Sequence, residues 1–115
     1  MKILLIDDEE SIRDGFGAYL KTFGHDVISA ADGKAGIQIL SQNPDREVVV
    51  TDLNMPGLDG VDVIKHVVAN HPGIKIILMS GNMTPMMEKA VKEIGASAAC
   101  GKSSLHDLMN LIEGN

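Results

Sequence analysis

The chain has 115 residues, which suits one domain built around a single hydrophobic core. Its 16 acidic and 10 basic side chains give a formal charge of −6, which argues against a nucleic-acid-binding surface, because such a surface needs clustered lysine and arginine. We expect no signal peptide and no membrane span, since the apolar run at residues 2–6 is short and ends in acids. The single cysteine, Cys100, has no disulfide partner within the chain. We therefore expect a cytoplasmic protein, with Cys100 as a small buried side chain.

The first predicted element is a strand over residues 2–6, an unbroken apolar run typical of strands covered on both faces of a parallel sheet. A helix follows, because four apolar side chains fall on one stripe and a glycine can end the helix after them. These residues are Ile12, Phe16, Leu20, Phe23 and Gly24. A second apolar run predicts a strand over 26–30, and Asp32 precedes a shorter helix over 33–42.

The third predicted strand, over residues 47–51, is the clearest because it contains three consecutive valines, which are β-branched. Asp59 can cap the helix that comes next along the chain. The apolar side chains that we expect on its stripe are Val61, Ile64 and Val68, and the helix should close at His71 and Pro72.

The last four predicted elements are two strands and two helices. A strand over 74–79 precedes a helix that starts at Thr84, with proline at its first position, and stops at Gly95. A strand over 97–100 precedes a final helix, where Ser104 begins a capping-box spacing. The alternation predicts a doubly wound α/β fold, a five-stranded parallel sheet flanked by five helices. Ligand chemistry in such folds lies at the carboxyl ends of the strands.

Polar residues stand at these carboxyl ends and should converge on one edge of the sheet. They are Asp7 and Asp8 after the first strand, Asp52 after the third, Ser80 after the fourth and Lys102 after the fifth. Three carboxylates that lie together repel one another unless a cation neutralises them, and an oxygen-only ligand set favours Mg²⁺, with Mn²⁺ as a substitute. The sequence thus predicts a hard-metal site.

Phosphoryl transfer to a carboxylate needs this type of neutralisation, because one anion attacks another. Asp52 opens a loop rich in glycine and proline, which suggests an exposed nucleophile. The metal, the Lys102 ammonium and the Ser80 hydroxyl would each hold one phosphoryl oxygen. Taken singly, each of these residues is more typical of a turn, a helix N-terminus or a solvated surface than of a functional site. Their joint occurrence on strand ends favours the functional interpretation.

The segments ILLIDDEE, VVVTDLNMPGLDG, IILMSG and ACGK carry a resemblance to the CheY-like response-regulator receiver domains of two-component signalling. The resemblance covers residues 1–115 as one receiver domain and implies the flavodoxin-like strand order 2-1-3-4-5. It implies that Asp52 is the phosphoacceptor, with Ser80 and Lys102 assisting. It also implies that Mg²⁺ is held by Asp7, Asp8, Asp52 and the backbone carbonyl of Asn54.

The donor implied by this family is the phosphohistidine of a sensor histidine kinase or phosphotransfer protein, or else a small phosphodonor. The domain would catalyse its own phosphorylation and slow autodephosphorylation, with Asn54 and Asn82 tuning the phosphoryl lifetime and no separate substrate turned over. A downstream protein would bind the face formed by the helix at 84–95, the strand at 97–100 and the last helix. The resemblance implies no direct contact with nucleic acid and leaves a homodimer open.

Two positions depart from the family pattern. Ala99 stands where an aromatic residue is usual, and Ser103 stands where proline usually follows the lysine. The customary ring movement cannot operate with Ala99, so we expect Met83, Met86 and Met87 to take part in switching or partner binding. The bond before Ser103 should be trans with a shifted loop, or else strained. A receiver-fold binding module that signals without phosphorylation is the alternative function.

Two other aspartate- or phosphate-handling classes fit less well. A haloacid-dehalogenase-type hydrolase needs an alternating D-x-D pattern, whereas Asp7 and Asp8 are adjacent. A flavin carrier needs backbone N–H groups for a phosphate after the first strand, and acids there would repel it. The four histidines are scattered and predict no metal site. The chain ends after the last helix, so we expect either a stand-alone regulator or a receiver from a longer protein.

Overall fold

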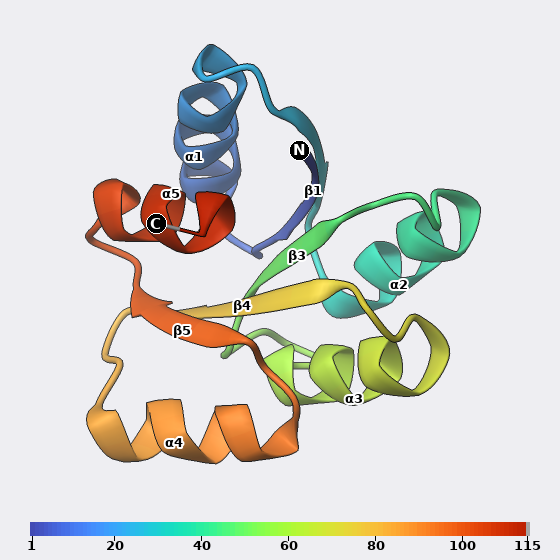
Figure 1. The fold of residues 1–115 in the computed structure, drawn as a ribbon, viewed down its shortest axis with the longest axis vertical. Helices are drawn as coiled ribbons and strands as arrows, with labels where there is room; N and C mark the ends of the chain where they lie inside the picture. Colours follow the sequence, from blue (N-terminus) through green and yellow to red (C-terminus); the bar gives the residue numbers. More distant parts are fainter. Residues whose placement is uncertain (115) are drawn as a thin grey trace.

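Five strands form one parallel sheet in the order β2-β1-β3-β4-β5 (Figure 1). The structure is a computed structural model that describes residues 1–114. The strands are β1 (Lys2–Ile6), β2 (Asp26–Ala30), β3 (Val48–Asp52), β4 (Lys75–Ser80) and β5 (Ala98–Gly101). All four neighbouring pairs are parallel. The expected order 2-1-3-4-5 is confirmed, and all five carboxyl ends meet at one edge.

Five helices cover the two faces of this sheet, with α1 and α5 on one face and α2, α3 and α4 on the other (Figure 1). They are α1 (Glu10–Thr22), α2 (Gly33–Gln42), α3 (Gly60–Asn70), α4 (Pro85–Ile94) and α5 (Leu105–Glu113). The predicted five-strand, five-helix α/β fold is therefore confirmed. None of the helices described is both long and apolar enough to cross a membrane.

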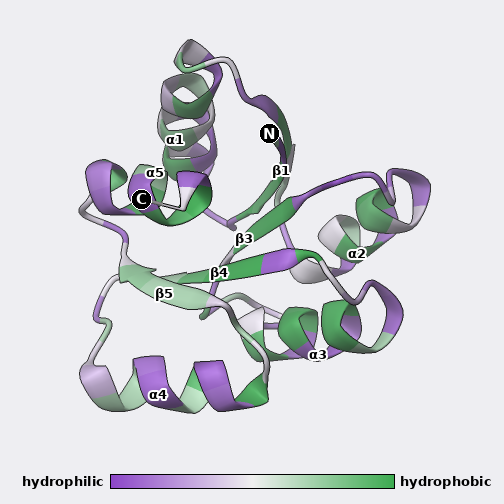
Figure 2. Cartoon of the chain, in the orientation of Figure 1, coloured by the Kyte–Doolittle hydropathy of each residue, from purple (hydrophilic) through white to green (hydrophobic). Residues whose placement is uncertain are grey.

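Alternate residues of each strand feed two separate cores. In β1, Ile3 and Leu5 pack on the side of α1 and α5, whereas Leu4 and Ile6 pack on the side of α2 and α3. The central strand β3 is buried along its whole length. Figure 2 shows the inner strands mostly green, in contrast to α4, whose ribbon alternates between purple and green. The unbroken apolar runs thus arise from burial on both sides.

The helical stripes wrongly placed two apolar side chains in the core. Helix α1 ends at Thr22, so Phe23 lies beyond it with 56% of its surface exposed. Its ring packs on Tyr19, with centroids 5.1 Å apart. In α3, Val68 is 46% exposed, and Val63 and Val67 take the core positions instead. The Phe23 error came from extending the helix past its end, and the Val68 error from choosing the wrong member of two neighbouring valines.

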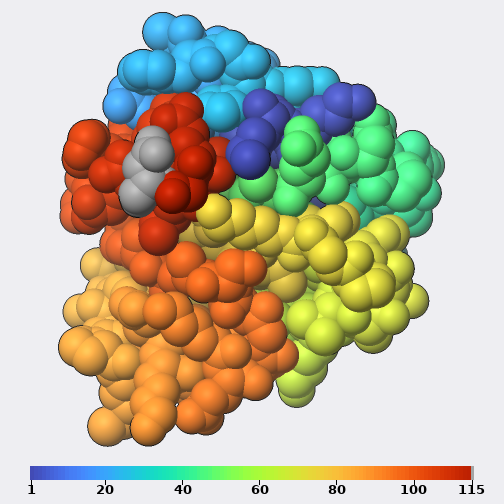
Figure 3. Space-filling model, viewed as in Figure 1, coloured from blue at the N-terminus to red at the C-terminus, as the bar shows by residue number. Residues whose placement is uncertain are grey.

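The last helix lies beside the first, as the red and light-blue surfaces in Figure 3 show. His25, which precedes β2, joins the two ends of the described chain. Its Nδ1 lies 2.9 Å from the amino group of Met1, and its Nε2 lies 3.2 Å from a carboxylate oxygen of Glu113. These contacts give His25 a structural role.

The amino edge of the sheet, opposite the polar strand ends, holds a buried arginine. Arg46 forms a two-point ion pair with Asp26, at 3.1 and 3.2 Å, and its side chain is 4% exposed. It also donates to the backbone carbonyl of Ile3 at 3.3 Å. The guanidinium therefore ties the starts of β1 and β2 to the loop before β3.

Candidate functional site

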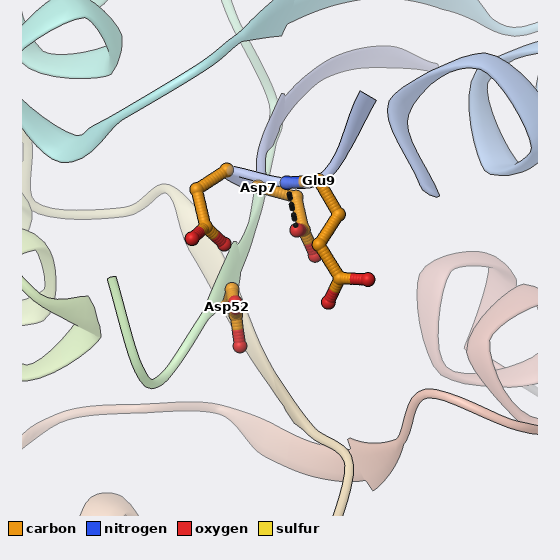
Figure 4. A group of neighbouring side chains, drawn as sticks. Asp7, Glu9 and Asp52 are labelled. Atoms are coloured by element: carbon orange, nitrogen blue, oxygen red, sulfur yellow. Dashed lines mark hydrogen bonds between the residues drawn. The ribbon is translucent and has the colours of Figure 1, made fainter. Parts of the chain in front are cut away.

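The carboxyl ends of β1 and β3 place Asp7 and Asp52 side by side. Ile6 of β1 pairs with Thr51 of β3, so the next residue on each strand lies at the same level of the sheet. Figure 4 shows the carboxylates of Asp7, Glu9 and Asp52 converging on one space. The parallel register therefore brings together acids that are 45 residues apart in the sequence, as the strand-end pattern predicted.

Lys102 lies among these acids and contacts three of them. Its Nζ is 2.9 Å from Asp52 Oδ2, 3.0 Å from Asp7 Oδ2 and 3.0 Å from Glu9 Oε1. The backbone N–H of Lys102 donates to the carbonyl of Ser80, which fixes the lysine at the end of β5 beside β4. The lysine side chain is 13% exposed. One ammonium thus bridges acids from two strand ends.

Asp7 is the most enclosed acid of the group, with no exposed surface. Its Oδ1 accepts a hydrogen bond from the Glu9 backbone N–H at 2.9 Å, shown dashed in Figure 4. Its Oδ2 accepts no hydrogen bond from any residue in the described part, and its contact with Lys102 is an ion pair only. Asp7 therefore keeps one buried oxygen available for a further cation.

Burial and crowding shift the protonation equilibria of the site. Burial raises the pKa of Asp52, the negative charge of Asp7 adds to this, and the hydrogen bond from Lys102 opposes both. Burial would lower the pKa of Lys102, yet its hydrogen bonds to Asp52 and Glu9 and its ion pair with Asp7 outweigh burial and raise that pKa above its ordinary value. Lys102 is accordingly a permanent cation at neutral pH.

A divalent cation fits this donor set. Asp7, Asp8, Glu9 and Asp52 each offer one oxygen, and these four oxygens lie within 4.8 Å of one another. Carboxylate oxygens are the ligands of hard ions such as Mg²⁺, and an acidic cluster of this kind is typical of receiver magnesium sites.

Ser80 ends β4 at the same edge and is 2% exposed. Its neighbour Met79 pairs with Asp52 across the β3–β4 ladder, and its Oγ accepts a hydrogen bond from the Asn82 backbone at 3.3 Å. The Asn54 backbone N–H donates to Asp52 Oδ1 at 3.4 Å. The structure therefore places both Ser80 and Asn54 at this edge. A role for the Asn54 carbonyl stays a prediction.

The expectation of an exposed Asp52 is wrong, because only 3% of its surface is accessible. Lys102 and Asp7 cover the carboxylate, and Gly60 lies so close behind that a Cβ there would stand 2.5 Å from the Asp52 carbonyl oxygen. Glu9 is the acid that the strand-end pattern missed, since it lies two residues beyond Asp7. The sequence signal for it was the acidic run that continues past Asp8 to the start of α1.

The two departures from the family pattern lie on the face formed by α4, β5 and α5. Ala99 and Ser103 line a hollow of about 540 Å³ together with Met83 and Leu111. No peptide bond in residues 1–114 is cis, so the bond between Lys102 and Ser103 is trans. Met86 is 82% exposed on α4. The part of these methionines in switching stays a prediction.

Cys100 lies on the buried side of β5 toward α5 and is 7% exposed. Burial raises the pKa of its thiol to about 11, with a smaller contribution from the charge of Asp107. The thiol is therefore protonated at neutral pH. The expectation of a small buried side chain is confirmed.

Known proteins resemble the chain in sequence and in structure. The transcriptional regulatory protein QseB of Haemophilus influenzae is 33% identical over 98 residues, which are 85% of this chain and 43% of QseB. The sporulation initiation phosphotransferase F of Bacillus subtilis is 30% identical over 96 residues, 83% of this chain and 76% of that protein. A response regulator receiver domain from Clostridium thermocellum superposes with a TM-score of 0.91 at 29% identity, covering 98% of this chain and 91% of that one.

Several curated relatives are much longer than this chain, which spans between 22% and 43% of their length. The model of the response regulator receiver domain family matches residues 3–113, almost the whole chain. The match includes the acids at the ends of β1 and β3 and the lysine that joins them. The chain belongs to the response regulator receiver domain family of two-component signal transduction.

Proposed function

We propose that Asp52 accepts a phosphoryl group from the phosphohistidine of a histidine kinase or phosphotransfer protein, or from a small phosphodonor. The observation that carries this proposal is the contact of 2.9 Å between Lys102 Nζ and Asp52 Oδ2 within a cluster of acids. An unpaired lysine would be expected in solvent, whereas this one is 13% exposed and neutralises a buried carboxylate at a strand end.

In the proposed reaction an Asp52 carboxylate oxygen forms a bond to phosphorus while the phosphorus–nitrogen bond of the donor histidine breaks. The leaving imidazole nitrogen keeps the electron pair of that bond and takes a proton. The product is an acyl phosphate, which water later hydrolyses to restore the carboxylate and release inorganic phosphate. The domain thus modifies itself and turns over no separate substrate.

The residues around Asp52 would stabilise the transferring group by charge and position. Lys102 would move its ammonium from Asp52 Oδ2 to a phosphoryl oxygen, which needs only a small displacement because the two groups are already in contact. The Ser80 hydroxyl, now accepting from the Asn82 backbone, would donate to a second oxygen. Asn54 and Asn82 would border the phosphoryl group and tune how long it persists.

A bound Mg²⁺ would neutralise negative charge on the phosphoryl oxygens. Asp7, Asp8 and Asp52 would hold it, with the Asn54 backbone carbonyl as a further ligand, and Mn²⁺ would substitute. The buried Asp7 oxygen without a hydrogen bond supports this assignment. Its ion pair with Lys102 would weaken as the lysine turns toward the phosphoryl group.

Phosphorylation would change the face formed by α4, β5 and α5, where a downstream protein binds. The proposed location is the cytoplasm, where histidine kinases present their phosphohistidine. Ala99 and the trans bond at Ser103 favour a second candidate, a receiver-fold module that signals by binding alone. Phosphorylation itself discriminates between these two functions.

The test is incubation with acetyl phosphate and Mg²⁺ followed by intact-mass measurement. We expect the wild type to gain the mass of one phosphoryl group, and Asp52→Asn to gain nothing. Asp14→Asn is the matched control, because Asp14 is an exposed acid on α1 outside the cluster and its loss should leave the gain unchanged. Absence of an adduct in the wild type with acetyl phosphate, phosphoramidate and a phosphohistidine donor would support the binding module instead.

A further inference from the structure

We propose that Glu9 selects phosphodonors by their charge. This inference rests on the proposed function, since it concerns which donor reaches Asp52. The Glu9 carboxylate would disfavour donors in proportion to the negative charge they carry. It is a specificity-determining residue, and the wild type would accept singly charged or partner-bound donors more readily than small dianions.

The position of Glu9 is fixed by the backbone rather than by a capping role. Its N–H donates to Asp7 Oδ1 at 2.9 Å, and its carbonyl accepts from the Arg13 backbone N–H at 3.1 Å in the first turn of α1. Its side chain makes no cap hydrogen bond at the start of that helix. The carboxylate therefore does not cap the helix, which is the usual role of an acid at a helix N-terminus.

That carboxylate instead faces the reaction centre. Its Oε1 is 3.0 Å from Lys102 Nζ, and a Glu9 oxygen lies within 4.8 Å of an oxygen of Asp52. The side chain is 57% exposed, whereas the other two acids on the lysine are almost fully buried. Glu9 is therefore the solvent-exposed acid of the three that contact Lys102, on the side from which we expect a donor to approach.

Charge balance makes this one residue decisive. The three aspartates of the cluster carry three negative charges, which Lys102 and one divalent cation would balance. Glu9 adds a fourth carboxylate and leaves the loaded site negative. A further cation beside the cluster, the Arg13 guanidinium, donates to the Asp7 backbone carbonyl. An anionic donor thus meets a net negative charge that exists because of Glu9.

The test compares Glu9→Gln with wild type using two small donors at pH 7, the acetyl phosphate dianion and the phosphoramidate monoanion. A unit charge at about 6 Å in a water-like dielectric changes a rate about threefold for each charge on the donor. We expect Glu9→Gln to accelerate phosphorylation by acetyl phosphate about tenfold and phosphorylation by phosphoramidate about threefold. The ratio of the two rates should therefore rise about threefold.

Salt and a neighbouring acid provide the controls. In about 1 M salt, where the Debye length is about 3 Å, the effect of Glu9→Gln on the ratio should disappear. Glu10→Gln removes the same charge one residue further on, outside the cluster, and should leave the ratio unchanged. The inference is overturned if Glu9→Gln leaves the ratio of the two phosphorylation rates unaltered, or if it slows phosphorylation by both donors equally. If the wild type takes a phosphoryl group from neither small donor nor from a phosphohistidine donor, the proposed function itself fails.

Discussion

Replacing Asp7 by asparagine should stabilise the fold when no divalent cation is present. Asparagine has nearly the same shape, and its carbonyl oxygen can still accept the Glu9 backbone N–H that Asp7 Oδ1 accepts now. The substitution therefore removes a buried charge while keeping the local hydrogen bond. Lys102 would keep its contacts with Asp52 and Glu9.

The expected size follows from opposing charges around Asp7. Three other acids have an oxygen within 4.8 Å, where two unit charges repel by about 3 kcal/mol at an effective dielectric of about 20. Attraction to Lys102 at 3.0 Å is about 5–6 kcal/mol on the same basis. Solvent screens the exposed Asp8 and Glu9, and burial of the Asp7 charge itself costs several kcal/mol. We expect a net stabilisation of about 1–3 kcal/mol.

The measurement is urea unfolding followed by far-ultraviolet circular dichroism with a chelator present. The midpoint of Asp7→Asn should lie about 1 M above that of the wild type. Asp14→Asn removes an exposed acid outside the cluster, and its free energy of unfolding should lie within about 0.5 kcal/mol of the wild-type value. Saturating Mg²⁺ should stabilise the wild type more than Asp7→Asn. A lower midpoint for Asp7→Asn in chelator would show that its ion pair with Lys102 outweighs the repulsion, and would refute this reasoning.

Two further predictions concern Cys100 and two glycines. The unfolded thiol ionises near 9.0 and the folded thiol near 11, so the folded state is disfavoured as pH rises between these pKa values. The stability of the wild type relative to Cys100→Ala should fall by about 1–2 kcal/mol between about pH 8 and pH 10 in urea titrations, and a constant difference would contradict this. Gly60→Ala should destabilise by about 1–3 kcal/mol, since its Cβ would stand 2.5 Å from a backbone oxygen. Gly15→Ala, which places a methyl group in open space on α1, should stabilise the fold by about 0.5–1 kcal/mol. Equal melting temperatures for Gly60→Ala and Gly15→Ala would be evidence against this packing.

The strand ends were predictable because they depend on local pattern and one topological rule. An apolar run followed by Asp7 or Asp52 marks a strand that stops at an acid, and parallel strands bring such stops to one edge. The residues 2–6 and 26–30 were placed without error. The strand at 47–51 was displaced by one residue, because Asp52 still pairs with Met79 and Glu47 does not belong to the strand.

Burial within the site could not be predicted, because it depends on contacts between distant segments. Asp52 looked exposed in a loop of glycine and proline, yet Lys102, which is 50 residues away, covers it. Glu9 looked like an ordinary acid at a helix start, and only the position of Lys102 shows that its carboxylate faces the site. Arg46 gave no signal in the sequence, since its partners lie on β1 and β2.

The sharing of one ammonium among Asp7, Glu9 and Asp52 means that these acids form a single thermodynamic unit. Withdrawing one partner lets the lysine redistribute toward the other two, so each acid owes its apparent contribution to the presence of its neighbours. Effects of single substitutions will consequently fail to add, and the coupling free energy between pairs becomes the informative quantity. Double-mutant cycles, rather than a residue-by-residue scan, are therefore the appropriate description of this edge of the sheet.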